Sequence, residues 1–207
     1  MIRNIVFDMG DVLLDYRPMT TCLRLAESPQ EAELLWKAVF QIPQWEREYD
    51  RGTISEEDML SQIQSGLPTQ ALKDRAASVF NTFHTDALTP HPGMEKVVRR
   101  VHQRGFSLYL LSNTALRFYL FQHLIAGLEL FDGLLLSAEE KLLKPDPAIY
   151  ARFFEKFSLK PQECFFIDDR EANIQGAALA GMEGYCFADG DAQRLEAFLE
   201  TLPAPGA

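Results

Sequence analysis

The sequence predicts an α/β fold with three layers, in which a central parallel sheet of five strands is covered by helices and carries an inserted helical segment. After residue 89, short apolar runs alternate with amphipathic segments, which is the pattern of a parallel sheet covered on both faces. Residues 16–88 show helical periodicity and no evident strand. We therefore expect a core domain of residues 1–15 and 89–207 and a helical domain of residues 16–88.

The first predicted strand is Asn4–Phe7. With the flanking Ile2 and Met9 it forms an apolar run rich in β-branched residues, as in a strand buried on both faces. Asp8 follows the strand directly, and Gly10 stands where a second carboxylate would make a catalytic pair. In open α/β sheets ligands bind at the carboxyl ends of the strands, so Asp8 is a candidate functional residue.

The inserted segment is predicted to be helical. Amphipathic patterns indicate helices over residues 31–40, 58–63 and 71–83, and Ser55 is a plausible capping residue for the second of them. The acidic stretch of residues 46–58 is expected to be a solvated face. Residues 89–93, with two prolines and a glycine, are predicted to be the linker that returns to the core.

The rest of the chain alternates between helix and strand. The predicted helices cover residues 94–103, 116–123, 146–157, 172–179 and 192–199. The predicted strands cover residues 106–111, 133–137, 164–167 and 184–187. With the N-terminal strand, this makes the five strands of the expected sheet.

Composition excludes several classes of function. The net charge is −10 and the chain is 47% hydrophobic, so a core is expected and nucleic acid is an unfavourable partner for the acidic surface. The three cysteines form no Cys-x-x-Cys pair, which fits a reducing compartment. No signal-peptide pattern is seen and no apolar run approaches the ~20 residues of a membrane span. We expect a cytoplasmic protein without a membrane partner.

Polar residues follow several of the predicted strands. Asp8, Ser112-Asn113 and Asp168-Asp169 would meet at one edge of the sheet, and Lys144 lies in the loop after the strand at 133–137. Three carboxylates in a small volume are unfavourable without a cation, and Mg²⁺ prefers oxygen ligands of this kind. Metal, lysine and an exposed carboxylate together match phosphoryl transfer through a covalent aspartyl-phosphate.

These residues resemble the four motifs of the haloacid dehalogenase superfamily. The first resemblance is Phe7-Asp8-Met9-Gly10-Asp11-Val12-Leu13, and the second is Leu111-Ser112-Asn113-Thr114. The third is Lys144-Pro145-Asp146-Pro147 with Ile149-Tyr150, and the fourth is Phe166-Ile167-Asp168-Asp169 followed by Asn173. Their order and separation match over nearly the whole chain. The resemblance implies a Rossmann-like core with an inserted α-helical cap.

The resemblance also implies roles for individual residues. Asp8 is the expected nucleophile and a metal ligand, and Lys144 neutralises charge on the nucleophile and the phosphoryl group. Ser112 and Asn113 are expected to bind the phosphoryl group. The backbone carbonyl of Gly10 and the carboxylates of Asp168 and Asp169 complete the expected Mg²⁺ site.

Gly10 departs from the usual phosphatase motif, which has aspartate at this position. That aspartate protonates the leaving oxygen and then activates water, which is worth roughly 10²–10⁴-fold in rate. Asp15, Glu46 and Glu48 are candidate replacements, and Asp11 is a weaker one. A subgroup that includes sugar-phosphate phosphatases similar to α-D-glucose-1-phosphate phosphatase also carries glycine here, and residues 51–55 resemble its cap.

The resulting prediction is a Mg²⁺-dependent phosphoric monoester hydrolase acting on a small phosphorylated metabolite, preferably a sugar phosphate. The aromatic residues of the inserted segment are expected to form its core, and Trp45 is the one candidate among them for substrate contact. The protein is expected to be a monomer or a weak homodimer. Two alternatives stay open: a 2-haloacid dehalogenase, and a phosphometabolite-binding protein with weak or no turnover.

Overall fold

A parallel sheet of five strands forms the centre of the computed structural model, which describes residues 1–205. In the order β5-β4-β1-β6-β7, the strands are Gly133–Leu136, Ser107–Ser112, Asn4–Phe7, Cys164–Asp168 and Glu183–Cys186. Phe7 at the end of β1 pairs with Leu110 of β4 and Ile167 of β6. The strands therefore end together, and the residues that follow them share one edge of the sheet.

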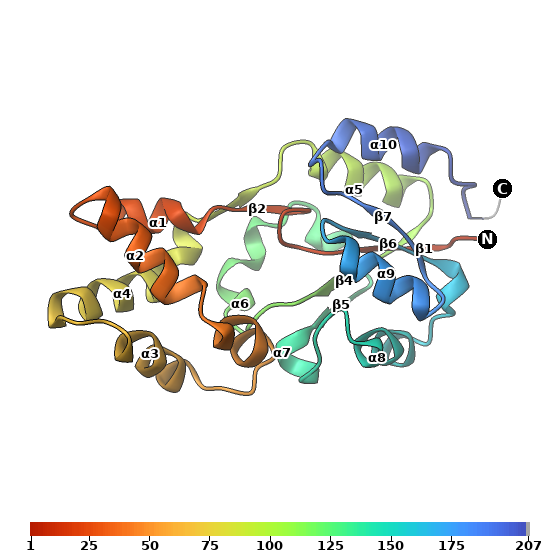
Figure 1. The fold of residues 1–207 in the computed structure, drawn as a ribbon. Helices are drawn as coiled ribbons and strands as arrows, with labels where there is room; N and C mark the ends of the chain where they lie inside the picture. Colours follow the sequence, from red (N-terminus) through yellow and green to blue (C-terminus); the bar gives the residue numbers. More distant parts are fainter. Residues whose placement is uncertain (206–207) are drawn as a thin grey trace.

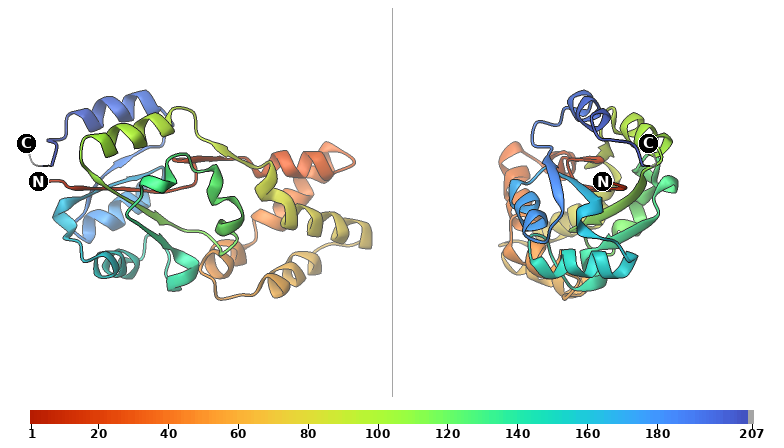
Figure 2. Two further views of the ribbon diagram at one scale, coloured as in Figure 1. Left: turned by 180° about the vertical axis from the view of Figure 1, so that it is seen from behind. Right: turned by 90° about the vertical axis from the view of Figure 1, so that its right-hand side faces the viewer.

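Helices cover both faces of this sheet (Figures 1 and 2). Helices α5 (Met94–Gln103) and α10 (Ala192–Glu200) pack with Ile5 and Phe7 of β1 in one apolar cluster. Helices α8 (Pro147–Phe157) and α9 (Glu171–Leu179) pack with Val6 of the same strand in a second cluster. Alternate side chains of β1 thus enter different layers, which confirms the predicted three-layer α/β fold with a Rossmann-like core.

The helices and strands of the core lie close to the predicted ranges, with two corrections. The helix expected at 116–123 is only α6 (Phe118–Phe121) followed by a 3₁₀ turn, Gln122–Leu124, because the backbone at Phe121 (φ −124°, ψ 1°) leaves the helical region. The strand expected to reach Ser137 stops at Leu136, and Ser137 begins the one-turn helix α7 (Ser137–Glu140). Two further 3₁₀ turns are Leu128–Leu130 and Pro161–Glu163.

Between residues 18 and 85 the chain is helical, as expected, and this part extends beyond the carboxyl edge of the sheet (Figure 1). It contains α1 (Pro18–Leu25), α2 (Pro29–Phe40), the π-helical turn η1 (Trp45–Asp50), α3 (Glu56–Ser65), α4 (Gln70–Thr82) and a 3₁₀ turn (Phe83–Thr85). The side chains of Ser28, Ser55 and Thr69 accept backbone N–H groups at the starts of α2, α3 and α4.

A short antiparallel ribbon joins the helical segment to the core. Its strands are β2 (Leu14–Tyr16) and β3 (Leu88–Pro90), so the expectation that residues 16–88 hold no strand and that residues 89–93 are only a linker is wrong at both ends. Three-residue strands are too short to show a period of two in the sequence. The predicted domain boundaries at 15/16 and 88/89 pass through this ribbon and stay a prediction.

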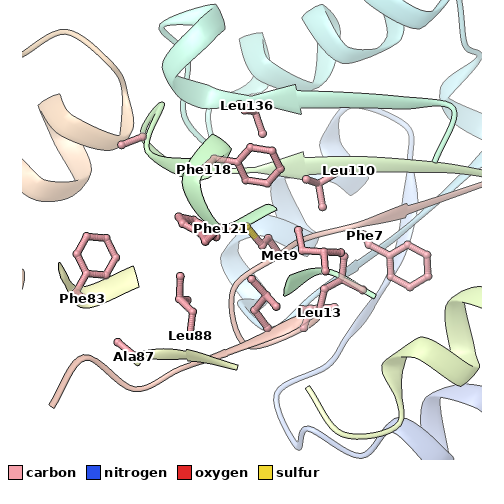
Figure 3. Packing of buried hydrophobic residues seen from close by; sticks show 14 of the residues in the cluster. Phe7, Met9, Leu13, Phe83, Ala87, Leu88, Leu110, Phe118, Phe121 and Leu136 are labelled. Atoms are coloured by element: carbon pink, nitrogen blue, oxygen red, sulfur yellow. The ribbon is translucent and has the colours of Figure 1, made fainter. Parts of the chain in front are cut away.

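Apolar side chains fill the junction beside the ribbon. Met9 and Leu13 from the first loop lie near Phe121 of α6, and Leu88 of β3 lies between them and Phe83 (Figure 3). All of these belong to the same buried cluster as the sheet residues Phe7 and Leu110. The helical segment is therefore packed onto the core through apolar contacts and not only tethered to it.

Gly176 on α9 allows this helix to approach the loop that carries Lys144. A Cβ at this position would lie 2.8 Å from the backbone oxygen of Pro145 and 3.0 Å from the ring of Tyr150. We expect Gly176→Ala to lower the free energy of unfolding by about 1–3 kcal/mol, because this overpacking outweighs the roughly 1 kcal/mol that alanine gains in a helix. Urea denaturation measures the change.

Gly66→Ala is the matched control for this prediction. Gly66 ends α3 with right-handed helical dihedrals, and a Cβ there would meet nothing within 4 Å. We expect its effect to stay within about 0.5 kcal/mol. Equal effects of the two substitutions would show that the close approach at Gly176 is unimportant.

Within residues 1–205, no helix has the length and apolarity needed to cross a bilayer.

Candidate active site

The carboxyl ends of the three central strands bring the predicted site residues together. Asp8 follows β1 and its backbone N–H donates to the carbonyl of Ile167, so the ladder continues to this residue. Ser112 is the last residue of β4, and Asp168 is the last residue of β6. All three are buried, with exposed fractions of 7%, 1% and 0%. Their depth follows from the parallel register of the strands.

Asp8, Asp168 and Asp169 form a cluster of carboxylates. One oxygen from each lies within 4.8 Å of the others. Burial raises the pKa of Asp8 to about 7, with Lys144 opposing the shift and Asp168 adding to it. Burial, with Asp168 and Asp11 nearby, also raises the pKa of Asp169. The site therefore holds more negative charge than its own residues compensate.

Lys144 is the cation of the site and is 2% exposed. Its Nζ lies 2.8 Å from Oδ1 of Asp8 and 2.7 Å from Oδ2 of Asp168, and it donates to the carbonyl of Leu111 at 2.9 Å. Burial lowers the pKa of Lys144, but the two carboxylates outweigh it and the net shift is upward. Lys144 is therefore charged and fixed between the two acids.

Asn113 fixes the loop that carries this lysine. Its side-chain amide donates to the carbonyl of Lys144 at 3.0 Å, and its Oδ1 accepts the N–H of Lys144 at 2.8 Å. Both ends of the Asn113 side chain are thus used within the protein. Asn113 lines the cavity together with Ser112, and its side chain positions the backbone of Lys144, so binding of a phosphoryl group by Ser112 and Asn113 stays a prediction.

Asp168 is held by the start of α9. The amide of Asn173 donates to both of its oxygens, at 2.9 and 3.0 Å, and the N–H of Arg170 donates to Oδ1 at 2.9 Å. Asn173 is itself buried, at 1% exposure, so both hydrogen bonds that it donates to the Asp168 carboxylate lie in the protein interior. In the sequence, Asn173 was noted only as the residue that ends the fourth motif, and its contact with Asp168 was not predicted.

Gly10 lies beside Asp8 on the wall of the same cavity. A Cβ at this position would meet nothing within 4 Å, so the space that a larger side chain would fill is open. Three clustered carboxylates facing one buried lysine fit a divalent cation with oxygen ligands. Asp8, Asp168, Asp169 and the Gly10 carbonyl remain the predicted ligands.

A cavity of about 610 Å³ connects this polar edge to the helical segment. The polar wall contains Asp8, Gly10, Ser112, Asn113, Lys144 and Asp169. The facing wall is largely apolar and aromatic, and contains Tyr16, Phe40, Ile42, Trp45, Tyr49, Phe83 and Leu88. Trp45, the predicted substrate contact, packs edge-on against Phe40, 4.9 Å between ring centroids, and so belongs to the cavity wall.

Several residues of the cavity were missed by sequence reasoning. Asp50 lies on η1 in the stretch expected to be a solvated face, yet it is half-buried and lines the cavity. Arg117 is buried, pairs with Glu56 at 2.7 Å and donates to the carbonyl of Phe80, which ties α6 to the helical segment. No local sequence pattern marks either residue, because both acquire their surroundings from distant parts of the chain.

The chain is similar to known proteins in sequence and in fold. A family model described as haloacid dehalogenase-like hydrolase matches residues 2–181. The chain is 29% identical to the sesquiterpene phosphatase astK of Aspergillus oryzae, over 92% of each chain. It is 25% identical to the phosphorylated carbohydrates phosphatase of Thermotoga maritima, over 88% of this chain and 83% of that protein.

A solved structure shows the same fold over nearly the full length. The L-2-haloacid dehalogenase RSc1362 superposes with a TM-score of 0.77 and covers 97% of this chain and 99% of its own. The two sequences are 19% identical, so the likeness concerns the fold alone.

Proposed function

This chain belongs to the haloacid dehalogenase-like hydrolases, and on that premise we propose that it is a Mg²⁺-dependent phosphatase that hydrolyses a small phosphorylated metabolite through an aspartyl-phosphate on Asp8. Membership of the superfamily confirms the resemblance seen in the sequence. The narrower resemblance to α-D-glucose-1-phosphate phosphatase stays a prediction. Asp8 carries the proposal, because it is a carboxylate held beside Lys144 at the polar end of a substrate-sized cavity.

The proposed roles follow from the contacts. Asp8 attacks phosphorus, while Lys144, paired with Asp8 and Asp168, balances the charge of the phosphoryl oxygens. Ser112 donates a hydrogen bond to one of these oxygens. Asp8, the Gly10 carbonyl, Asp168 and Asp169 would hold the Mg²⁺, which when bound stabilises negative charge on the transferring group.

The charge balance of the site favours phosphatase over dehalogenase chemistry. Dehalogenation of a 2-haloacid requires no metal, and its substrate is itself a carboxylate. Three carboxylates around one lysine would repel such a substrate, whereas they suit a metal and a phosphate. Two relatives that match most of the chain are named as phosphatases, which supports the same choice.

The organic part of the substrate would contact the aromatic wall of the cavity. A sugar phosphate is the substrate expected from sequence, and the relative from Thermotoga maritima is named for phosphorylated carbohydrates. The facing wall, with Phe40, Trp45 and Phe83, instead favours an apolar organic group, and the relative from Aspergillus oryzae is named for a sesquiterpene. We propose that apolar phosphate monoesters are hydrolysed with higher kcat/KM than sugar phosphates.

Metal removal tests the proposed function. We expect phosphate release from a panel of isoprenoid, aryl and sugar phosphates to fall at least about 100-fold after treatment with EDTA, and to return when Mg²⁺ is added. Removal of the ion leaves the excess carboxylate charge facing an anionic substrate. A malachite-green phosphate assay measures the rates, with 2-chloropropionate as the dehalogenase control.

The outcomes separate the candidate functions. Metal-independent chloride release would favour the dehalogenase. Mg²⁺ binding by calorimetry without turnover of any ester would favour the phosphometabolite-binding alternative. Higher kcat/KM for sugar phosphates than for apolar esters would leave the phosphatase standing and overturn only its proposed substrate preference.

A further inference from the structure

The proposed phosphatase lacks the acid that usually serves its leaving group, because residue 10 is glycine. We propose that Asp50, supplied by the helical segment, is the general acid and base of the reaction. This inference rests on the proposed phosphatase function of the same site. It assigns a catalytic group to a residue that none of the four motifs contains.

Asp50 lies next to the loop that follows the phosphate-binding strand. It is the last residue of η1, and its carbonyl accepts a hydrogen bond from Ser137 Oγ at 2.5 Å. Ser137 Oγ in turn accepts the N–H of Thr114 at 2.8 Å. The backbone N–H of Ala115 interacts with the Asp50 carboxyl group. The backbone of Asp50 is therefore held to Ser137, and its carboxyl group lies beside Ala115, in the loop that follows Ser112 and Asn113.

The other acids near the cavity are already engaged. Outside the metal cluster, the carboxyl groups lining the cavity are those of Asp11, Glu46 and Asp50. Asp11 pairs with Arg17 at 2.6 Å and accepts the N–H of Tyr16, and Glu46 pairs with Arg170 at 3.0 Å. Among the described residues, no lysine or arginine forms an ion pair with Asp50.

The two acids outside the cavity are weaker candidates. Asp15 contacts His91 Nδ1 at 2.5 Å, and neither Asp15 nor Glu48 lines the cavity. Asp15, Glu46 and Glu48 were the replacements suggested by the sequence. The contacts favour Asp50 over each of them.

The environment of Asp50 favours the protonated form of its carboxyl group. Burial raises its pKa well above the usual value, the Glu46 carboxylate adds to this, and only the N–H of Ala115 opposes it. Tyr16 faces it from β2, and its phenol also has a raised pKa because of burial and the Asp50 charge. The Tyr16 hydroxyl is buried and makes no hydrogen bond within residues 1–205. A ligand oxygen between these two groups would find two donors.

The proposed reaction balances with Asp50 in both steps. Asp8 attacks phosphorus, the bond from phosphorus to the organic oxygen breaks, and the Asp50 proton passes to that oxygen to release an alcohol. The resulting Asp50 carboxylate then takes a proton from water while the water oxygen attacks phosphorus. The bond to Asp8 breaks, phosphate leaves, and Asp50 is again protonated.

Asp50→Asn tests this role, measured on phosphate esters of graded leaving-group acidity. For alkyl phosphates, which need protonation, we expect kcat/KM to fall about 10²–10³-fold. For 4-nitrophenyl phosphate we expect a fall of less than about threefold, together with a burst of nitrophenolate, because the intermediate forms normally but its hydrolysis has lost the base. A merely structural change would lower all esters alike and give no burst.

Two further variants make the test specific. Glu48→Gln changes an acid on the same helical turn that does not line the cavity, and its kcat/KM values should match those of the wild type. Gly10→Asp adds the usual acid where a Cβ has free space. In Gly10→Asp/Asp50→Asn, we expect alkyl phosphate hydrolysis to recover at least about tenfold relative to Asp50→Asn.

The results distinguish the proposed role of Asp50 from the phosphatase function on which it rests. Wild-type protein that hydrolyses no ester in Mg²⁺ would refute the phosphatase proposal itself. Active wild type with equal losses across the ester series in Asp50→Asn, or with no loss, would refute Asp50 as acid and base while the phosphatase stands. If Asp50→Asn lowers the thermal midpoint, recovery of activity in the double variant supports the role, and no recovery overturns it.

Discussion

Asp8→Asn is expected to reduce phosphate release from every substrate by about 10³-fold or more, because the amide cannot form the covalent intermediate. Asparagine has nearly the shape of aspartate, so the change removes the proposed nucleophile and one proposed metal ligand without opening a cavity. The loss should appear in kcat for both good and poor leaving groups, in contrast to the graded effect expected at Asp50. Steady-state phosphate assays at saturating Mg²⁺ measure it.

The same substitution should leave the fold intact. Lys144 faces both Asp8 and Asp168 in the wild type, and in the variant it faces Asp168 alone, so the negative charge of the buried site is reduced. We expect the thermal midpoint in EDTA to be equal or higher. Asp74→Asn, at an exposed position on α4, is the control and should be fully active. Retention of more than about a tenth of the activity in Asp8→Asn would contradict a nucleophilic Asp8.

Lys144→Met is expected to lower the free energy of unfolding of the metal-free protein by about 3–5 kcal/mol, the usual effect of breaking a buried ion pair from one side. Methionine fills the volume of the lysine chain but leaves Asp8 and Asp168 buried without their cation. The loss is a charge effect, and so it should be recovered in part by Mg²⁺. Guanidinium unfolding in EDTA and in Mg²⁺ compares the two states.

Lys160→Met provides the control for this prediction. Lys160 is exposed and lies 3.5 Å from Glu163, a contact of the kind that contributes at most about 1 kcal/mol. We expect its change in stability to stay within about 0.5 kcal/mol. Similar effects of the two lysine substitutions would mean that the carboxylates of the site are compensated by some other group.

The sheet and the polar residues at its carboxyl edge were predictable because local sequence patterns specify them. A strand buried on both faces is apolar, as β1 is, and the polar residue that ends it stands out at once. The parallel order then places Asp8, Ser112 and Asp168 at one edge without knowledge of any contact. The position of Lys144 in the loop after the strand at 133–137 was also predicted, whereas its burial was seen only in the structure.

The cavity wall opposite this edge was largely hidden from the sequence. The stretch that becomes η1 is rich in acids, so it predicts a solvated face, and only contacts with Ala115 and Ser137 place Asp50 on the cavity. Helix α1 was missed because only Thr21 and Cys22 are buried along it, a weak apolar pattern. The side chain of Asn113 illustrates a further limit, since a motif names a residue but not which of its atoms are already bonded.

Ser137 connects η1 of the helical segment to the loop that follows β4. Its hydroxyl donates to the carbonyl of Asp50 and accepts the N–H of Thr114, so η1 cannot move away from the sheet without breaking the hydrogen bond between Ser137 and Asp50. If the cavity opens by movement of η1 to release the alcohol or phosphate, the proposed general acid Asp50 moves away from the site as well. Hydrolysis would then take place only in the closed arrangement and product release only in the open one. A protein that closes incompletely would not hydrolyse the ester.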